Sequence, residues 1–233
     1  MTRLCGADGC RAGWIGVTED LSTGSITWSV TSSLEALGSD SKAAMIALDV
    51  PIGLPDQGSR DCDVTARRLL GPKRGSSVFP APIRPILDAK SHSEACTIRE
   101  AVEGKRLSIQ AWAIVPKVLE VDRAMRGSAE LRGRVREVHP EICFYHLAAG
   151  RPMQHAKKTR EGREERLSLL REEFGPAVEA ALAGRKQLRC AADDVVDAFV
   201  GLWTARRAWV GQAITLPSVP PQDRHGLPME MVA

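Results

Sequence analysis

Residues 3–19 constrain the fold most, because they contain two short apolar strands and one acid that does not suit them. The strands are predicted at 3–8 and 13–18 and are joined by a glycine-containing turn. Asp8 closes the first strand. An acid at the end of a buried strand needs a cation, a donor or water, since an ionised carboxylate is poorly solvated in a protein interior. The fold is therefore expected to bring other residues to Asp8.

Three further strands are predicted from the distribution of apolar residues. Residues 25–30 continue an antiparallel meander, and the pattern returns at 134–139. Residues 43–50 are almost continuously apolar, which is typical of a strand buried on both faces of a parallel arrangement. This run also ends in an acid, Asp49, and Pro51 stops it. The expected class is α/β, with a mixed five-stranded sheet of three antiparallel strands followed by parallel strands, flanked by helices.

The remaining segments indicate helices and one extended arm. Helices are predicted at 32–38, 61–70, about 93–103, 108–126 with a kink or break at Pro116, 140–147, 157–174, from near Pro176, and 191–210. Residues 1–233 are expected to form a single domain, with 56–130 as a helical insertion within it. The C-terminal arm is expected over 212–233, with 229–232 as an edge strand.

Composition limits the function classes. The 233 residues are 43% hydrophobic and 26% charged, without an apolar run long enough to cross a bilayer, so no membrane partner is expected. The first residues lack the pattern of a secretory signal, and cytoplasm is the expected location. The six scattered cysteines form no Cys-x-x-Cys pair, which favours reduced thiols over a structural zinc site. A net charge of +3 permits a polyanionic partner.

A late helix supplies acids that can join those at the strand ends. Asp194 and Asp197 lie about one turn apart in an otherwise apolar helix, with Asp193 as an alternative first member. Together with Asp8 and Asp49 they are carboxylates from three distant segments. Oxygen ligands in that number suit Mg²⁺ or Mn²⁺. The joint arrangement therefore predicts a divalent metal site.

Each acid also has a purely structural explanation. An Asp before Gly, like Asp8, is often a turn residue. Asp49 can cap its own loop, and acids in the first turn of a helix are favoured by capping and by the helix dipole, which accounts for Asp193 and Asp194. Asp197 is harder to explain in this way because it lies a turn further into the apolar helix.

Long motifs resemble a known family over residues 4–209. They are Asp8-Gly-Cys-Arg-x-Gly-Trp14, Asp49-Val-Pro-Ile-Gly-Leu-Pro55, Cys62-Asp63 with Ala66-Arg67, Ser77-Val-Phe-Pro80, Pro116-Lys117 with Glu120 and Asp122, and Glu137-Val-His-Pro-Glu141. These motifs look like domain-of-unknown-function family 429, whose members are described as predicted nucleases of the ribonuclease H-like superfamily. The order of the acids also resembles the Holliday-junction resolvase branch of that superfamily.

The resemblance implies a ribonuclease H-like sheet and two-metal hydrolysis of a nucleic-acid phosphodiester. The metal ligands that it implies, which are also catalytic, are Asp8, Asp49, Asp194 and Asp197. The second acid in nucleases of this fold is often Glu, so Asp49 is a departure. Glu141 is a further catalytic candidate that can compensate for the shorter Asp49, with Glu137 as the alternative. His139 is either a ligand or proton carrier or a core histidine.

Basic residues are candidates for binding substrate phosphates, and for each of them a solvated helical face is the simpler explanation. They are Arg11, Arg67, Arg74, Arg84 and Lys117. The expected partner is a nucleic acid or a nucleotide-like phosphodiester, and a homodimer is left open. Two alternatives remain: a non-catalytic nucleic-acid or nucleotide-binding protein with the same fold, and an ATP-dependent phosphotransferase of the actin-like or sugar-kinase type.

Overall fold

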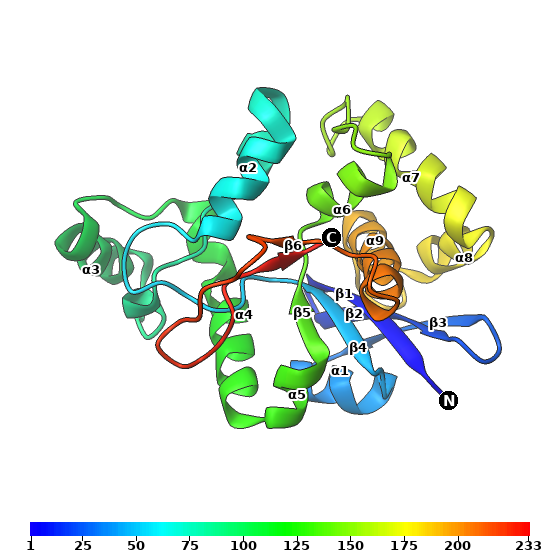
Figure 1. Ribbon diagram of the computed structural model, residues 1–233, viewed down its shortest axis with the longest axis horizontal. Helices are drawn as coiled ribbons and strands as arrows, with labels where there is room; N and C mark the ends of the chain where they lie inside the picture. The colour runs from blue at the N-terminus through cyan, green and yellow to red at the C-terminus, as the bar shows by residue number, and fades with distance from the viewer.

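A computed structural model describes residues 1–233 and shows one five-stranded sheet between two layers of helices (Figure 1). The strands are β1 (Arg3–Cys10), β2 (Gly13–Asp20), β3 (Ser25–Thr31), β4 (Met45–Asp49) and β5 (Val135–Glu137), in the spatial order β3-β2-β1-β4-β5. The first three strands pair antiparallel, whereas β4 runs parallel to β1 and β5 parallel to β4. The expected α/β class and mixed sheet are confirmed.

The helices follow the predicted segments, except that residues 129–134 form a short helix that was not predicted. They are α1 (Leu34–Ser41), α2 (Asp61–Arg74), α3 (His92–Glu103), α4 (Ile109–Gly127), α5 (Ala129–Arg134), α6 (Pro140–Leu147), α7 (Arg160–Phe174), α8 (Ala177–Gly184) and α9 (Ala192–Trp209), with short 3₁₀ turns at Gly75–Ser77 and Arg84–Ile86. None of them combines the length and the apolar character that crossing a bilayer requires.

Two helices differ from their predicted form. Of the kink or break expected at Pro116, the break does not occur: α4 continues through this residue. Val115 and Val118 beside it are buried in the core, and this packing offsets the hydrogen bond that proline cannot donate. Helix α7 starts at Arg160 instead of at residue 157, since the Thr159 hydroxyl accepts the Gly162 amide and caps the helix there.

Alternating side chains of the strands divide the core between the two faces of the sheet. Cys5 and Ile46 pack with α1, α4 and other parts of residues 56–130. Leu4 and Ala47 point the opposite way and pack with α9. The part of residues 56–130 from Ala81 onward therefore shares a core with one face of the sheet, and α9 covers the other. Helix α2 packs in a smaller third cluster with Ile142 and Met231.

Helix α9 lies very close to β1, and a glycine makes this possible. A Cβ atom at Gly6 would lie 1.9 Å from the backbone nitrogen of Leu202 and 2.1 Å from the carbonyl oxygen of Ala198. Gly201 on the helix faces the same contact, since a Cβ there would lie 3.3 Å from the Gly6 Cα. The backbones of α9 and β1 thus touch without intervening side chains.

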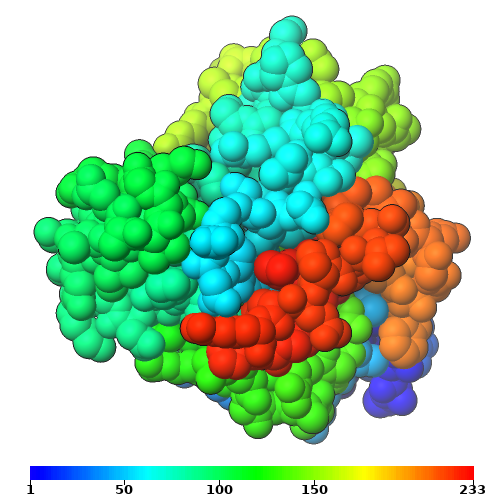
Figure 2. All heavy atoms as spheres, turned by 60° about the vertical axis from the view of Figure 1, so that its left-hand side comes forward, coloured from blue at the N-terminus to red at the C-terminus, as the bar shows by residue number.

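The C-terminal arm is packed against the molecule (Figure 2). It contains β6 (Thr215–Leu216) and β7 (Met231–Val232), which form a separate two-stranded sheet, so the predicted edge strand is shorter and does not extend the main sheet. Asp223 holds the arm in place. Its carboxylate accepts the backbone amides of Leu54 at 3.1 Å and Leu227 at 3.0 Å, and it pairs with Arg84.

Removing this carboxylate is expected to loosen the arm. Asp223→Ala would leave the buried Arg84 with Asp122 as its remaining partner and would leave three backbone amides, those of Leu54, His225 and Leu227, without this acceptor, which should lower the free energy of unfolding by about 3 kcal/mol. Limited proteolysis should then cut the arm faster. Asp56→Ala is the matched control, because the Asp56–Arg224 pair is more than half exposed. Equal cleavage of the two variants would contradict the prediction.

Candidate metal centre

Asp8 and Asp49 are neighbours in the sheet. The register of the parallel strands β1 and β4 pairs these two residues directly at the carboxyl ends of both strands. Because side chains alternate along a strand, Asp8 lies on the same face as Leu4, and Asp49 on the same face as Ala47. Both acids therefore face the side of the sheet that α9 covers.

Asp197 comes to the same place from α9. The close contact at Gly6 brings the helix onto β1, and Asp197 lies one turn before Gly201. One carboxylate oxygen from each of Asp8, Asp49 and Asp197 lies within 4.8 Å of the others. We call these three residues the carboxylate centre.

Lys157 is the cation that contacts the carboxylate centre. The Lys157 ammonium donates to Oδ2 of Asp197, whose side chain is only 4% exposed. The other oxygen of Asp197, Oδ1, is buried and has no hydrogen-bond partner. A buried carboxylate oxygen without a donor is costly, so this atom is available for a ligand.

Burial and mutual repulsion make the carboxylate centre difficult to ionise. Burial raises the pKa of Asp8, and the nearby charges of Asp49 and Asp197 raise it further. The same causes, burial first and then the charge of Asp197, raise the pKa of Asp49 to about 8. Burial raises the pKa of Asp197 to about 6, although Lys157 opposes the change. The three carboxylates are therefore stable in the folded protein only when protons or other cations neutralise them.

Because the pKa of Asp49 is raised, the effect of Asp49→Asn on stability is expected to depend on pH. Folding raises the pKa of Asp49 from 3.8 to about 8, so the folded state favours the protonated carboxyl. The stabilisation that this gives is fully present below pH 3.8 and is lost as pH rises through about 8. The amide does not titrate. In the presence of a chelator at pH 8.5, the free energy of unfolding of the variant should be higher than that of the wild type by about 2 kcal/mol, which corresponds to a Tm about 4–8 °C higher. This difference should shrink towards pH 4. A difference independent of pH would contradict the assignment.

The other predicted acids lie outside the carboxylate centre. Asp194 accepts the backbone amide of Ala191 at 2.8 Å and caps α9, which is the structural explanation that its position allowed. Glu141 is paired with Arg74 at 2.7 Å and with Arg166. Although burial opposes ionisation of Glu141, these arginines lower its pKa. Glu141 is thus neutralised by two cations of its own.

Glu137, the alternative to Glu141, is also fully engaged. Its carboxylate accepts the Ile52 amide at 2.5 Å and pairs with Arg60 at 2.6 Å. Arg60 in turn pairs with Asp63 at 2.6 Å, and all three charged side chains are buried. This buried network joins the start of α2 to the end of β5.

The five predicted phosphate-binding residues fall into two groups. Arg74, Arg84 and Lys117 already have partners: Arg74 binds Glu141, Arg84 is buried between two aspartates, and the Lys117 ammonium donates to the Gly13 carbonyl at 2.9 Å. Arg11 lies exposed in the turn between β1 and β2, without an ion pair. Arg67 is exposed on α2, although its Nε donates to the Val78 carbonyl at 2.7 Å.

Two residues that shape the carboxylate centre, Gly6 and Lys157, are not predicted from the sequence. The predicted helix 157–174 has Lys157 in its first turn, whereas Lys157 lies in the turn before α7. The N-cap residue Thr159 is a signal that would have ended the helix before it. No local signal connects Lys157 with Asp197, which lies 40 residues further along the chain.

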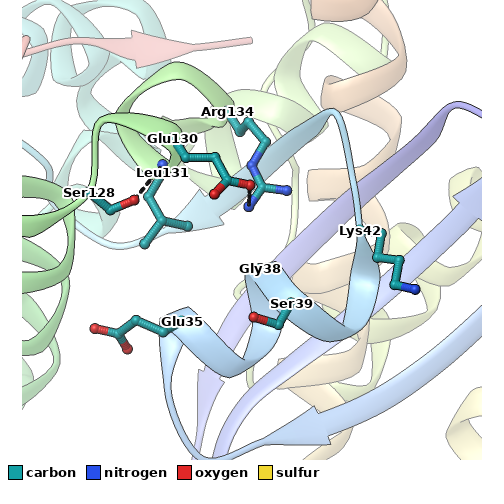
Figure 3. Close-up of a pocket in the computed structure, with 8 residues that line it drawn as sticks. All are labelled: Glu35, Gly38, Ser39, Lys42, Ser128, Glu130, Leu131 and Arg134. Carbon is teal, nitrogen blue, oxygen red and sulfur yellow. Dashed lines mark hydrogen bonds and ion pairs between the residues drawn. The ribbon is translucent and has the colours of Figure 1, made fainter.

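A hollow of about 350 Å³ lies elsewhere, between α1 and α5 (Figure 3). Its walls carry charges of both signs, including Glu35, Lys42 and the pair of Glu130 with Arg134. Helix α1 packs on the face of the sheet opposite to α9. The hollow therefore has no part in the carboxylate centre.

The fold and the centre define an α/β protein with a candidate metal site at the carboxyl ends of parallel strands. A family model matches residues 6–222, and the chain belongs to the family described as "Protein of unknown function (DUF429)". The family expected from the motifs is thus confirmed, and the matched range includes all three acids of the centre. No curated protein and no solved structure matches the chain.

Proposed function

We propose that this protein is a divalent-metal-dependent nuclease or phosphodiesterase with a ribonuclease H-like fold. The observation that carries the proposal is the convergence of Asp8, Asp49 and Asp197 within 4.8 Å, with one buried oxygen of Asp197 lacking a partner. The resemblance to ribonuclease H-like nucleases implies such a centre. In it, an acid of the first strand, an acid of a neighbouring strand and an acid of a late helix meet on a mixed sheet.

The residues present fit Mg²⁺ or Mn²⁺. All three side chains offer hard oxygen ligands, and no histidine or cysteine belongs to the group. A bound divalent ion would supply a Lewis acid that activates water and stabilises charge on a phosphate oxygen. One carboxylate oxygen from each of Asp8 and Asp49, together with Oδ1 of Asp197, would hold the ion.

The surroundings favour attack by water over a protein nucleophile. Burial raises the pKa of the Cys143 thiol to about 12, so this cysteine is not a thiolate at neutral pH. Burial lowers the pKa of His139, which is then neutral near pH 7. Neither residue forms a nucleophile and base pair with a hydrogen-bonded acid.

Exposed basic and aromatic side chains favour a polyanionic substrate with bases. Arg67, Arg68 and Lys73 are exposed on α2, and Phe79 in the loop that follows is 57% exposed. Figure 1 shows α2 and α7 both rising above the sheet, with α6 between them. An exposed phenylalanine beside guanidinium groups suits a nucleic-acid strand, whose phosphates and bases contact these two kinds of side chain.

The test is hydrolysis of a panel of branched, hybrid, duplex and single-stranded nucleic acids. We expect cleavage of at least one of them in Mg²⁺ or Mn²⁺, and none with a chelator. Binding that weakens with salt but produces no cleavage under either metal would contradict the proposal and favour a non-catalytic nucleic-acid-binding protein.

A further inference from the structure

We propose that Lys157 is a built-in cation of the carboxylate centre and that it limits the centre to one divalent ion. The ammonium would take the role that a second ion has in a two-metal site. This inference rests on the proposed metal-dependent function and changes its expected metal count. It also assigns Lys157 as a positioning residue, which acts through Asp197.

The ion pair of Lys157 with Asp197 is the one salt bridge that any residue of the carboxylate centre makes. The other cations nearby are committed to other acids. Arg60 pairs with Glu137, and Arg166 pairs with Glu141. Lys157 is also the one cation among the main causes that shift the pKa values of Asp8, Asp49 and Asp197.

The charges of the centre match one divalent ion. Carboxylates bind a metal ion in the deprotonated form, so with an ion bound the three carboxylates and one ammonium carry two negative charges in total. One Mg²⁺ or Mn²⁺ cancels them, whereas two such ions would leave two positive charges in a partly buried site. An uncompensated buried charge costs several kcal/mol in general, so a second ion is disfavoured while the ammonium is present.

The two oxygens of Asp197 divide these roles. Oδ2 accepts from the Lys157 ammonium, and Oδ1 is buried without a partner. The lysine fixes the orientation of the carboxylate and leaves Oδ1 for the metal ion. Ligands to a metal are commonly oriented in this way by a second hydrogen-bonding partner.

Hydrogen bonds fix the backbone on both sides of Lys157. The Thr159 hydroxyl donates to the Ala156 carbonyl at 2.9 Å, and the backbone amide of Gln154 donates to the side-chain carboxylate of Glu165 in α7 at 2.7 Å. Gly162 allows the first turn of α7 to lie against this segment, because a Cβ atom there would be 2.0 Å from the Ala156 oxygen. Lys157 is therefore placed by the fold, unlike a mobile surface lysine.

The test counts Mn²⁺ ions bound to the full-length chain, by calorimetry and by electron paramagnetic resonance at pH 8. We expect one ion per wild-type chain and two per Lys157→Met chain, with Lys157→Gln as a second variant should the first not fold. Lys157→Arg keeps the cation and should bind one. Lys158→Met is the matched control, because Lys158 is exposed and makes no ion pair, and it should also bind one.

Two ions on the wild type, or one ion on both neutral variants, would overturn the inference. The count separates this inference from the proposed function. An active enzyme with two ions would contradict only the role of Lys157, whereas one ion without phosphodiesterase activity would contradict only the function. A chain that binds no ion would contradict both.

Discussion

Asp8→Asn is expected to reduce metal-dependent phosphodiester cleavage by roughly 1,000-fold, which corresponds to about 4 kcal/mol of transition-state stabilisation. Asn has the shape of Asp but lacks its charge. Asp8 is paired in register with Asp49, and a carboxylate oxygen of Asp8 lies within 4.8 Å of one from Asp49 and one from Asp197. Binding of Mn²⁺ should weaken in parallel. The measurements are initial rates on the best substrate and a Mn²⁺ titration.

Folding should survive this substitution. Burial and the neighbouring carboxylates raise the pKa of Asp8, so a neutral amide relieves repulsion in the metal-free protein. Asp40→Asn is the matched control, because Asp40 is an exposed acid of α1 on the opposite face of the sheet. Full activity of Asp8→Asn, or an equal loss in Asp40→Asn, would remove the carboxylate centre from the mechanism.

Gly6→Ala is expected to have the largest effect on stability, with a loss of more than about 4 kcal/mol or a failure to fold. A methyl group at Gly6 would lie 1.9 Å from the Leu202 nitrogen and 2.1 Å from the Ala198 oxygen, which are backbone atoms that no rotamer change can move. The helix must shift away from β1, and Asp197 moves with it. Chemical denaturation measures the loss, and any folded fraction should bind Mn²⁺ weakly.

Gly133→Ala is the control for this experiment. A Cβ at Gly133 meets nothing within 4 Å, and the residue lies in helix α5, where alanine is favoured by up to about 1 kcal/mol. This variant should be unchanged or slightly more stable. If Gly6→Ala behaved in the same way, the close contact of α9 with β1 would not be what positions Asp197.

Much of the fold could be predicted from local patterns. The glycine-joined apolar segments of residues 3–18 indicated the antiparallel strands, and the continuous apolar run at 43–50 indicated a buried parallel strand. Both patterns depend on burial along a single strand, so they are visible in the linear sequence. The same patterns placed Asp8 and Asp49 at strand ends, where the register makes them neighbours.

The candidate site could be predicted only in part, because helix periodicity cannot choose between residues of similar position. Asp194 and Asp197 lie on nearby parts of α9, yet Asp194 caps the helix and Asp197 points into the centre. Likewise, Glu141 was expected to be catalytic and Arg74 to bind substrate phosphates, and the two pair with each other. Such choices depend on which side chains from distant segments meet.

The sequence by itself determined most of the elements and the class of the sheet, and it included all three acids of the centre among four predicted ligands. Strand and helix formation follow from the local order of apolar, glycine and proline residues. Only the tertiary structure decided that α9 lies directly on Gly6, that Asp197 and not Asp194 joins Asp8 and Asp49, and that Lys157 contacts this group. Those contacts join residues 40 or more positions apart. They depend on how closely whole elements pack, which no local pattern records.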